Sequence, residues 1–99
     1  MMRMDSKDLE KVLAGNPVLS EEERIALRYL NMMHDMLQDQ NSLFARIEGA
    51  SVEGYRKRYQ KAVEHGIMVE DYAVELKLVE DAGFRKRIFG LYKTQCQRP

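Results

Sequence analysis

The amino-acid sequence predicts an all-α fold, a compact bundle of four to five helices around one long central amphipathic helix of about residues 21–48. Apolar residues recur at spacings of three and four along most of the chain, which is the pattern of amphipathic helices. Serine and aspartate stand where helices would begin, and glycine stands where they would end. A chain of 99 residues suffices for one modest core, so residues 1–99 are expected to form a single helical domain.

The first expected helix covers about residues 6–14, and Asp5 or Ser6 is placed to cap it. The sequence Ser-Glu-Glu-Glu that follows, from Ser20 to Glu23, matches a capping box, in which each terminal side chain bonds to the other residue's backbone amide. The long helix that begins there contains no glycine or proline and would extend about 40 Å. Its apolar stripe is wide, so we expect it to contact more than one neighbour.

Three further helices are expected beyond the long one, at about residues 52–65, 70–82 and 84–95. Ser51 is placed to cap the first of these, and Gly66 is placed to end it in the left-handed conformation. Residues 69–79 fit a helix but also alternate in part as a strand does; length and neighbours favour the helix. The last two helices are either separated by a bend at Gly83 or continuous.

Charge and composition indicate the compartment. The 16 basic and 16 acidic residues cancel, but residues 1–50 carry a net charge of −3 and residues 51–99 carry +3. Cys96 is the only cysteine, which excludes an intrachain disulfide and is typical of a reducing compartment. No signal-peptide pattern is present, and no stretch approaches the roughly 20 apolar residues of a membrane span. We therefore expect a cytoplasmic protein with no membrane partner.

No residue pattern points to catalysis, to a metal or to a cofactor. His34 and His65 have no companion at a recognised metal-ligand spacing, and the pair Asp35 and Asp39 forms no closed ligand set. Neither a Ser-His-Asp or Cys-His arrangement nor a glycine-rich phosphate loop occurs. We therefore expect a protein that is not an enzyme, with no catalytic residue, no cofactor and no metal.

One short pattern occurs twice. GYRKRYQKA, from Gly54, and GFRKRIFGL, from Gly83, share a glycine, an aromatic residue and an Arg-Lys-Arg run. In both copies the apolar residues lie on one helix face, the middle lysine points away from it, and the arginines lie beside it with their charges in water. This structural interpretation is favoured for the first copy, because Glu53 and Glu64 are spaced to pair with its lysines.

The second copy is expected to be more open to a partner. Phe89 lies off its apolar face beside Lys86, and residues 84–95 contain no acid. An exposed aromatic beside cations is typical of single-stranded nucleic-acid sites and equally of protein interfaces. A third interpretation needs no partner. Phe89 would then pack on the long helix, and the cations would complement the dipole of their own helix.

A cluster of methionines lies on the long helix. Methionine adapts to more than one partner surface, although a methionine stripe is more often core. The long helix offers more apolar surface than its short neighbours would cover. A symmetric homodimer through this helix would bury the remainder.

The favoured hypothesis is a small adaptor or regulatory protein that binds another protein through the long helix and the cationic C-terminal helix. The residues expected to bind this partner are Met32, Met33, Met36, Phe89, Arg85, Lys86 and Arg87. The alternative is a small nucleic-acid-binding regulator that uses both Arg-Lys-Arg segments. The residues expected to bind nucleic acid are Arg56, Lys57, Arg58, Lys61, Arg85, Lys86, Arg87 and Lys93.

Overall fold

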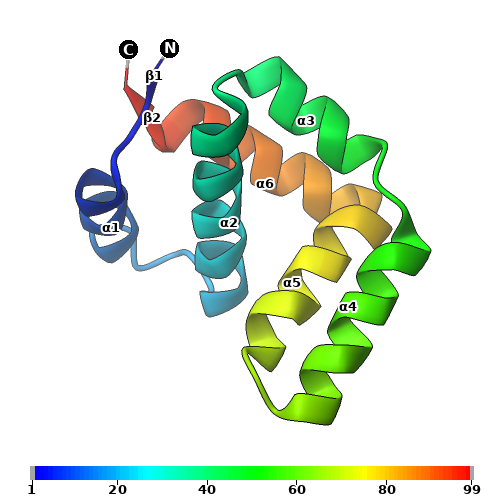
Figure 1. Ribbon diagram of the computed structural model, residues 1–99. Helices are drawn as coiled ribbons and strands as arrows, with labels where there is room; N and C mark the ends of the chain where they lie inside the picture. Colours follow the sequence, from blue (N-terminus) through cyan, green and yellow to red (C-terminus); the bar gives the residue numbers. More distant parts are fainter. Residues whose placement is uncertain (1, 99) are drawn as a thin grey trace.

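The computed structural model of the chain describes residues 2–98, with side chains described for residues 4–96. Within this range the chain forms six helices and one pair of two-residue strands (Figure 1). The elements in chain order are β1 (Met2–Arg3), α1 (Ser6–Ala14), α2 (Glu21–Leu37), α3 (Gln40–Glu48), α4 (Val52–His65), α5 (Val69–Glu80), α6 (Ala82–Gln95) and β2 (Gln97–Arg98). The predicted all-α helical bundle is confirmed.

The single long helix predicted for residues 21–48 is wrong, because the chain leaves the helical conformation after Leu37. Gln38 has left-handed backbone angles, with φ at 56°. The Asp39 carboxylate then accepts hydrogen bonds from the Ser42 backbone amide at 3.1 Å and the Ser42 hydroxyl at 2.7 Å. This local bonding caps a new helix and competes with continuation of the old one. The described chain therefore has six helices in place of the four to five predicted.

Other predicted helix boundaries are confirmed. The Ser20 hydroxyl accepts a hydrogen bond from the Glu23 amide at 3.1 Å, and the Glu23 carboxylate accepts one from the Ser20 amide at 2.9 Å. Ser51 caps α4 by accepting a hydrogen bond from the Gly54 amide at 3.1 Å. Gly66 ends α4 with φ at 65°, a conformation that glycine adopts without steric cost.

Two helices occupy the region for which the sequence left alternatives open. Residues 69–79 lie within α5, so the helical interpretation is confirmed. α6 is a separate helix, and the break lies at Asp81 instead of Gly83. The Asp81 carboxylate accepts a hydrogen bond from the Phe84 amide at 3.0 Å, which caps α6.

The core lies where α2, α3, α5 and α6 meet, and α1 packs beside α2 (Figure 1). Its large, fully buried side chains include Leu27, Leu30, Leu43, Ile47, Leu78, Ile88 and Tyr92. The rings of Phe44 and Phe89 stack with their centroids 4.2 Å apart, which joins α3 to α6.

A buried polar chain ties the N-terminal segment to this core. The Tyr92 hydroxyl donates to Asn31 Oδ1 at 3.2 Å, and Asn31 Nδ2 donates to the Met4 carbonyl at 3.1 Å. His34 Nδ1 lies 2.7 Å from the same hydroxyl. Since the single hydroxyl proton goes to Asn31, His34 is the donor in that bond. The two chain ends consequently lie side by side, and β1 pairs antiparallel with β2 (Figure 1).

Candidate functional site

The three methionines predicted to bind a partner lie in different environments. Met32 and Met36 are 52% and 70% exposed, whereas Met33 is partly buried against the core. Met68, which precedes α5, was not singled out from the sequence and is 62% exposed. It has left-handed backbone angles, with φ at 49°, in the turn between α4 and α5.

Much of the apolar stripe predicted for the long helix is interior. Four of its residues are buried in the core: Ala26, Leu30, Phe44 and Ile47. The sequence predicts one continuous helix of about 40 Å, with enough uncovered apolar surface to pair two copies of the chain. The described residues form two shorter helices instead, and no such continuous apolar surface exists among them. The exposed apolar surface is confined to smaller groups of side chains.

Met32 and Met68 line one groove of about 420 Å³ between α2, α4 and α5, which we call the methionine groove. Its apolar and aromatic wall consists of Ile25, Tyr29, Met32, Met68 and Tyr72. Its charged side chains are Arg28, Arg58, Asp71 and Glu75. Met36 lies one helical turn beyond Met32 on the same face of α2 and extends the apolar surface.

Arg58 and a pair of tyrosines connect the three helices around the methionine groove. The guanidinium carbon of Arg58 lies 5.5 Å from the ring centroid of Tyr55 and 5.4 Å from that of Tyr72. Arg58 Nη2 donates to Glu75 Oε1 at 3.1 Å. The hydroxyls of Tyr29 and Tyr55 are hydrogen bonded at 2.9 Å. Arg58, Glu75 and the hydroxyls of Tyr29 and Tyr55 are therefore partnered inside the chain.

Burial shifts the pKa of two groups in this wall. Burial raises the pKa of the Glu75 carboxyl above its usual value, and the neighbouring Arg58 opposes that shift. Burial and the hydrogen bond with Tyr55 raise the pKa of Tyr29 well above its usual value. Tyr29 is consequently a neutral phenol at physiological pH and supplies no phenolate nucleophile.

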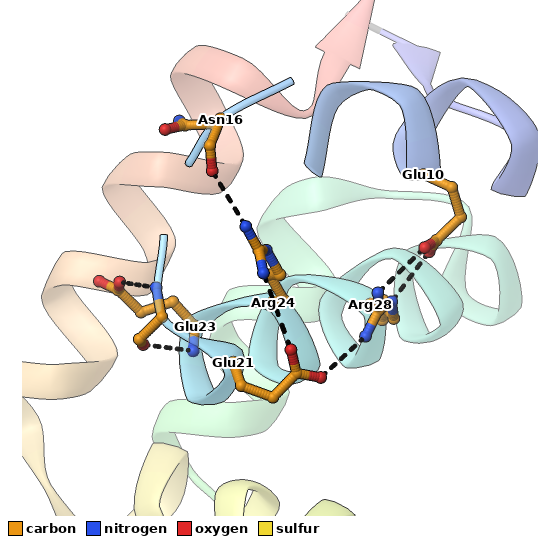
Figure 2. Close-up of polar contacts among 7 residues, drawn as sticks. Glu10, Asn16, Glu21, Glu23, Arg24 and Arg28 are labelled. Carbon is orange, nitrogen blue, oxygen red and sulfur yellow. Dashed lines mark hydrogen bonds and ion pairs between the residues drawn. The ribbon is translucent and has the colours of Figure 1, made fainter. Parts of the chain in front are cut away.

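The rim of the methionine groove is net acidic. Arg28 Nε donates to Glu10 of α1 at 2.9 Å, and Arg28 Nη1 lies 3.7 Å from Glu21 (Figure 2). The hydrogen bond from Arg28 lowers the pKa of Glu10, so this carboxylate is ionised at neutral pH. The lining of the groove holds Arg28 and Arg58 against Asp71 and Glu75 and is neutral when all are ionised. Its ion-paired neighbours are Glu10, Glu21 and Arg24, which brings the set to three cations against four carboxylates and a net charge of −1.

The arginines of the first Arg-Lys-Arg run tie α4 to α5. Arg56 lies 3.1 Å from Glu80 of α5 and 3.8 Å from Glu53 of its own helix. Arg58 pairs with Glu75 as described above. Lys57 and Lys61, the other two residues of the predicted nucleic-acid surface on this helix, are exposed.

The arginines of the second run tie α6 to two other helices. Arg85 Nη1 donates to the carbonyl of Leu78 at 3.3 Å and to that of Val79 at 3.0 Å, at the C-terminal end of α5. Arg87 forms an ion pair with Glu23 of α2. The two hydrogen bonds from Arg85 satisfy backbone carbonyls that the end of α5 would otherwise leave without partners.

The expectation that Phe89 is an exposed aromatic beside the cations is wrong. Phe89 is 8% exposed, because its ring face is covered by Phe44 of α3. The interpretation of Phe89 as a packing residue is confirmed. Its neighbour is Phe44, which lies in α3, the C-terminal part of the predicted long helix. Lys93 lies over the ring of Phe44, with its Nζ 5.1 Å from the ring centroid.

Three of the predicted cations nevertheless lie around one hollow on α6. This cationic groove has a volume of about 560 Å³ and is lined in part by Phe89. Its other lining residues are Glu48, Ala82, Arg85, Lys86, Gly90 and Lys93. It shares no lining residue with the methionine groove.

The described residues contain no cluster of three or more histidine, cysteine or acidic side chains arranged to hold a metal ion. Cys96 is buried, and burial raises the pKa of its thiol to about 11, so its reactive thiolate is scarce at neutral pH. Between residues 2 and 98, no helix is long and apolar enough to span a bilayer.

Comparison of the chain with protein-family models, with curated proteins and with solved structures finds no match.

Proposed function

We propose that this protein is a non-enzymatic adaptor or regulator that binds another protein in the methionine groove. The observation that carries the proposal is the position of Met32, Met36 and Met68, each more than half exposed, in or beside one groove. Exposed apolar side chains gathered in this way are typical of interaction sites. Methionine is flexible and polarisable, so it can pack against a partner surface of irregular shape.

The dimensions and charge of the groove indicate the kind of partner. A volume of about 420 Å³ accommodates a few side chains of a larger molecule. A partner's amphipathic helix binds such a groove by inserting apolar side chains spaced three and four residues apart. The net charge of −1 around the groove favours basic residues beside those apolar ones. The proposed partner segment is therefore a basic amphipathic helix.

The alternative function, nucleic-acid binding by the Arg-Lys-Arg segments, has less support. Phe89, the aromatic expected to stack on bases, has its ring face against Phe44. Arg56, Arg58 and Arg87 are each paired with a carboxylate inside the chain. A phosphate backbone would have to displace these carboxylates before it could use the arginines.

The proposal is tested with two fluorescent helix-forming peptides, one made of leucine and lysine and the other of leucine and glutamate. We expect the wild-type chain to bind the lysine peptide more tightly in fluorescence anisotropy. Met32→Gln combined with Met68→Gln should weaken that binding about tenfold, because both anchors become polar while the net charge is kept. Circular dichroism should show unchanged helix content, since both side chains are exposed.

Val18→Gln supplies the matched control, because Val18 is 80% exposed and lies outside both grooves. This variant should bind the lysine peptide as the wild type does. Equal binding by the wild type and the double methionine variant would contradict the proposal. Tight binding of single-stranded RNA that is lost on changing Arg85, Lys86 and Arg87 to Gln would favour the alternative.

A further inference from the structure

The outer face of α6 carries two lysines at a regular spacing. Lys86 and Lys93 are seven residues apart, which places them on the same helix face about 10.5 Å apart along the axis. Both are exposed, and neither lies within ion-pair distance of a carboxylate in the described chain. The cationic groove beside them holds three positive side chains and one carboxylate, Glu48. This face therefore attracts anions.

Two small residues of α6 lie beside these lysines. Ala82 and Gly90 line the same groove, and a Cβ added at Gly90 would meet no atom within 4 Å. Gly90 is thus not required by packing inside the chain, although glycine is unfavourable within a helix. Small residues on a helix face allow a second helix to approach closely, because the distance between helix axes depends on the side chains at the contact.

The same face is poorly suited to nucleic acid. Phe89 lines the groove but is only 8% exposed, and one face of its ring is stacked on Phe44, so little aromatic surface is available for a base. Glu48 lies in the groove and would repel a phosphate backbone. A protein partner can place its carboxylates on the lysines and avoid Glu48.

A second copy of the chain does not have the matching charges. No helix among α1 to α6 carries two acidic residues seven positions apart. A partner helix with such a pair would hold both carboxylates on one face at the spacing of Lys86 and Lys93. We propose that the cationic groove is a second docking surface, which binds an acidic α-helix of another protein through carboxylates seven residues apart.

The proposal is tested with two helix-forming peptides of identical composition. One carries two glutamates seven residues apart on one face, and the other carries them on opposite faces. We expect the wild-type chain to bind the first peptide about fivefold more tightly in anisotropy titrations, because two exposed ion pairs are worth little more than that. Lys86→Gln with Lys93→Gln should remove the preference, and binding should weaken with added salt.

Lys57→Gln is the matched control, because Lys57 is the corresponding lysine of the first Arg-Lys-Arg run and lies outside the groove. A second pair of variants tests close approach without changing charge. Gly90→Ala should bind the acidic peptide as the wild type does, whereas Gly90→Leu should weaken binding about fivefold or more by steric overlap with the docked helix. A Cβ at Gly90 meets no neighbouring atom within 4 Å, and circular dichroism should show the helix content of the wild type in both variants.

Three results would overturn the proposal. The first is equal binding of the two peptides by the wild type, and the second is unchanged binding by the double lysine variant. The third is tighter binding of a single-stranded DNA oligonucleotide than of the acidic peptide. Met32→Gln with Met68→Gln separates this surface from the methionine groove, because that variant should leave binding of the acidic helix unchanged.

Discussion

The two copies of the Gly-aromatic-Arg-Lys-Arg pattern lie in different parts of the bundle. In α6, Ile88 and Tyr92 are completely buried in the core. At the corresponding positions of α4, Tyr59 is only partly buried and Val63 is half exposed. α6 is thus a central helix, whereas α4 packs mainly on α5 at the margin. The shared pattern specifies a helix with one apolar face, and its neighbours decide how deeply that face is buried.

The basic residues of the two copies have similar roles despite this difference. In both, the flanking arginines bond to neighbouring helices and the middle lysine, Lys57 or Lys86, is exposed. A repeated basic run is therefore no evidence of a ligand by itself. The two copies differ in which cations line a hollow: Arg85, Lys86 and Lys93 line the cationic groove on α6, whereas Arg58 and Lys61 line a hollow between α4 and α5.

The largest expected effect on stability comes from shortening a buried side chain on the apolar face of α6. Ile88→Ala should lower the free energy of unfolding by about 2–4 kcal/mol, because it leaves a cavity in the core. Tyr59→Ala, at the corresponding position of α4, should cost about 1 kcal/mol, since less apolar area is lost from a partly buried side chain. Urea unfolding of both variants measures the difference. Equal losses would show that α4 and α6 contribute alike to the core.

A smaller effect is expected from the ion pair of the first copy. Arg58→Met should cost about 1–2 kcal/mol at neutral pH, because it leaves the buried Glu75 carboxylate without its cation. Burial already raises the pKa of Glu75, and loss of Arg58 raises it further. The cost should therefore be lost as the pH falls through the raised pKa of Glu75, above the usual value of 4.5, because a protonated carboxyl no longer needs the cation.

Arg56→Met provides the comparison for Arg58→Met. The partners of Arg56, Glu53 and Glu80, are exposed, so its loss should cost less than about 0.5 kcal/mol. Urea unfolding at neutral and acidic pH measures both variants. A cost of Arg58→Met that stays constant with pH would contradict the role given to Glu75.

The smallest expected effect concerns the ion pair of the second copy. Glu23→Gln keeps the capping box, since glutamine can serve at that position, but removes the charge that faces Arg87. We expect a loss of about 0.5 kcal/mol at neutral pH. Hydrogen bonds from the Ser20 amide and from Arg87 lower the pKa of Glu23 below 4.5, so its contribution is present above that pH and is lost as the pH falls through the lowered pKa.

Urea unfolding at pH 7 and at about pH 3 tests this assignment. The difference between wild type and Glu23→Gln should shrink at the lower pH. A difference that grows on acidification would mean that Glu23 is not stabilised in its charged form.

The features predicted correctly from the sequence are those set by residues three or four positions apart. The capping box at Ser20 and Glu23 and the glycine end at Gly66 depend on such local bonds. The break after Leu37 is not predicted from the sequence, because no glycine or proline marks it. The sequence feature that marks this break is Asp39, three residues before Ser42. At that spacing an aspartate side chain accepts a hydrogen bond from the backbone amide and caps a new helix.

The position of Phe89 could not be predicted for a tertiary reason. Phe44 reaches it from α3, and that helix exists as a separate element only because the chain turns at Gln38. The methionine groove likewise depends on packing, since it combines side chains from α2, α4 and α5. A partial signal for Met68 is its place after Gly66, in a turn where an apolar side chain has no helix face to join.

Methionine methyl NMR tests the central claim, that the methionine groove is the contact surface, most directly. The chain contains seven methionines, and labelling their methyl groups gives one reporter for each. On titration with the leucine–lysine peptide, the signals of Met32, Met36 and Met68 should shift, while that of Met33, which packs against the core, should not. Unchanged signals of Met32 and Met68 in the presence of bound peptide would contradict the account.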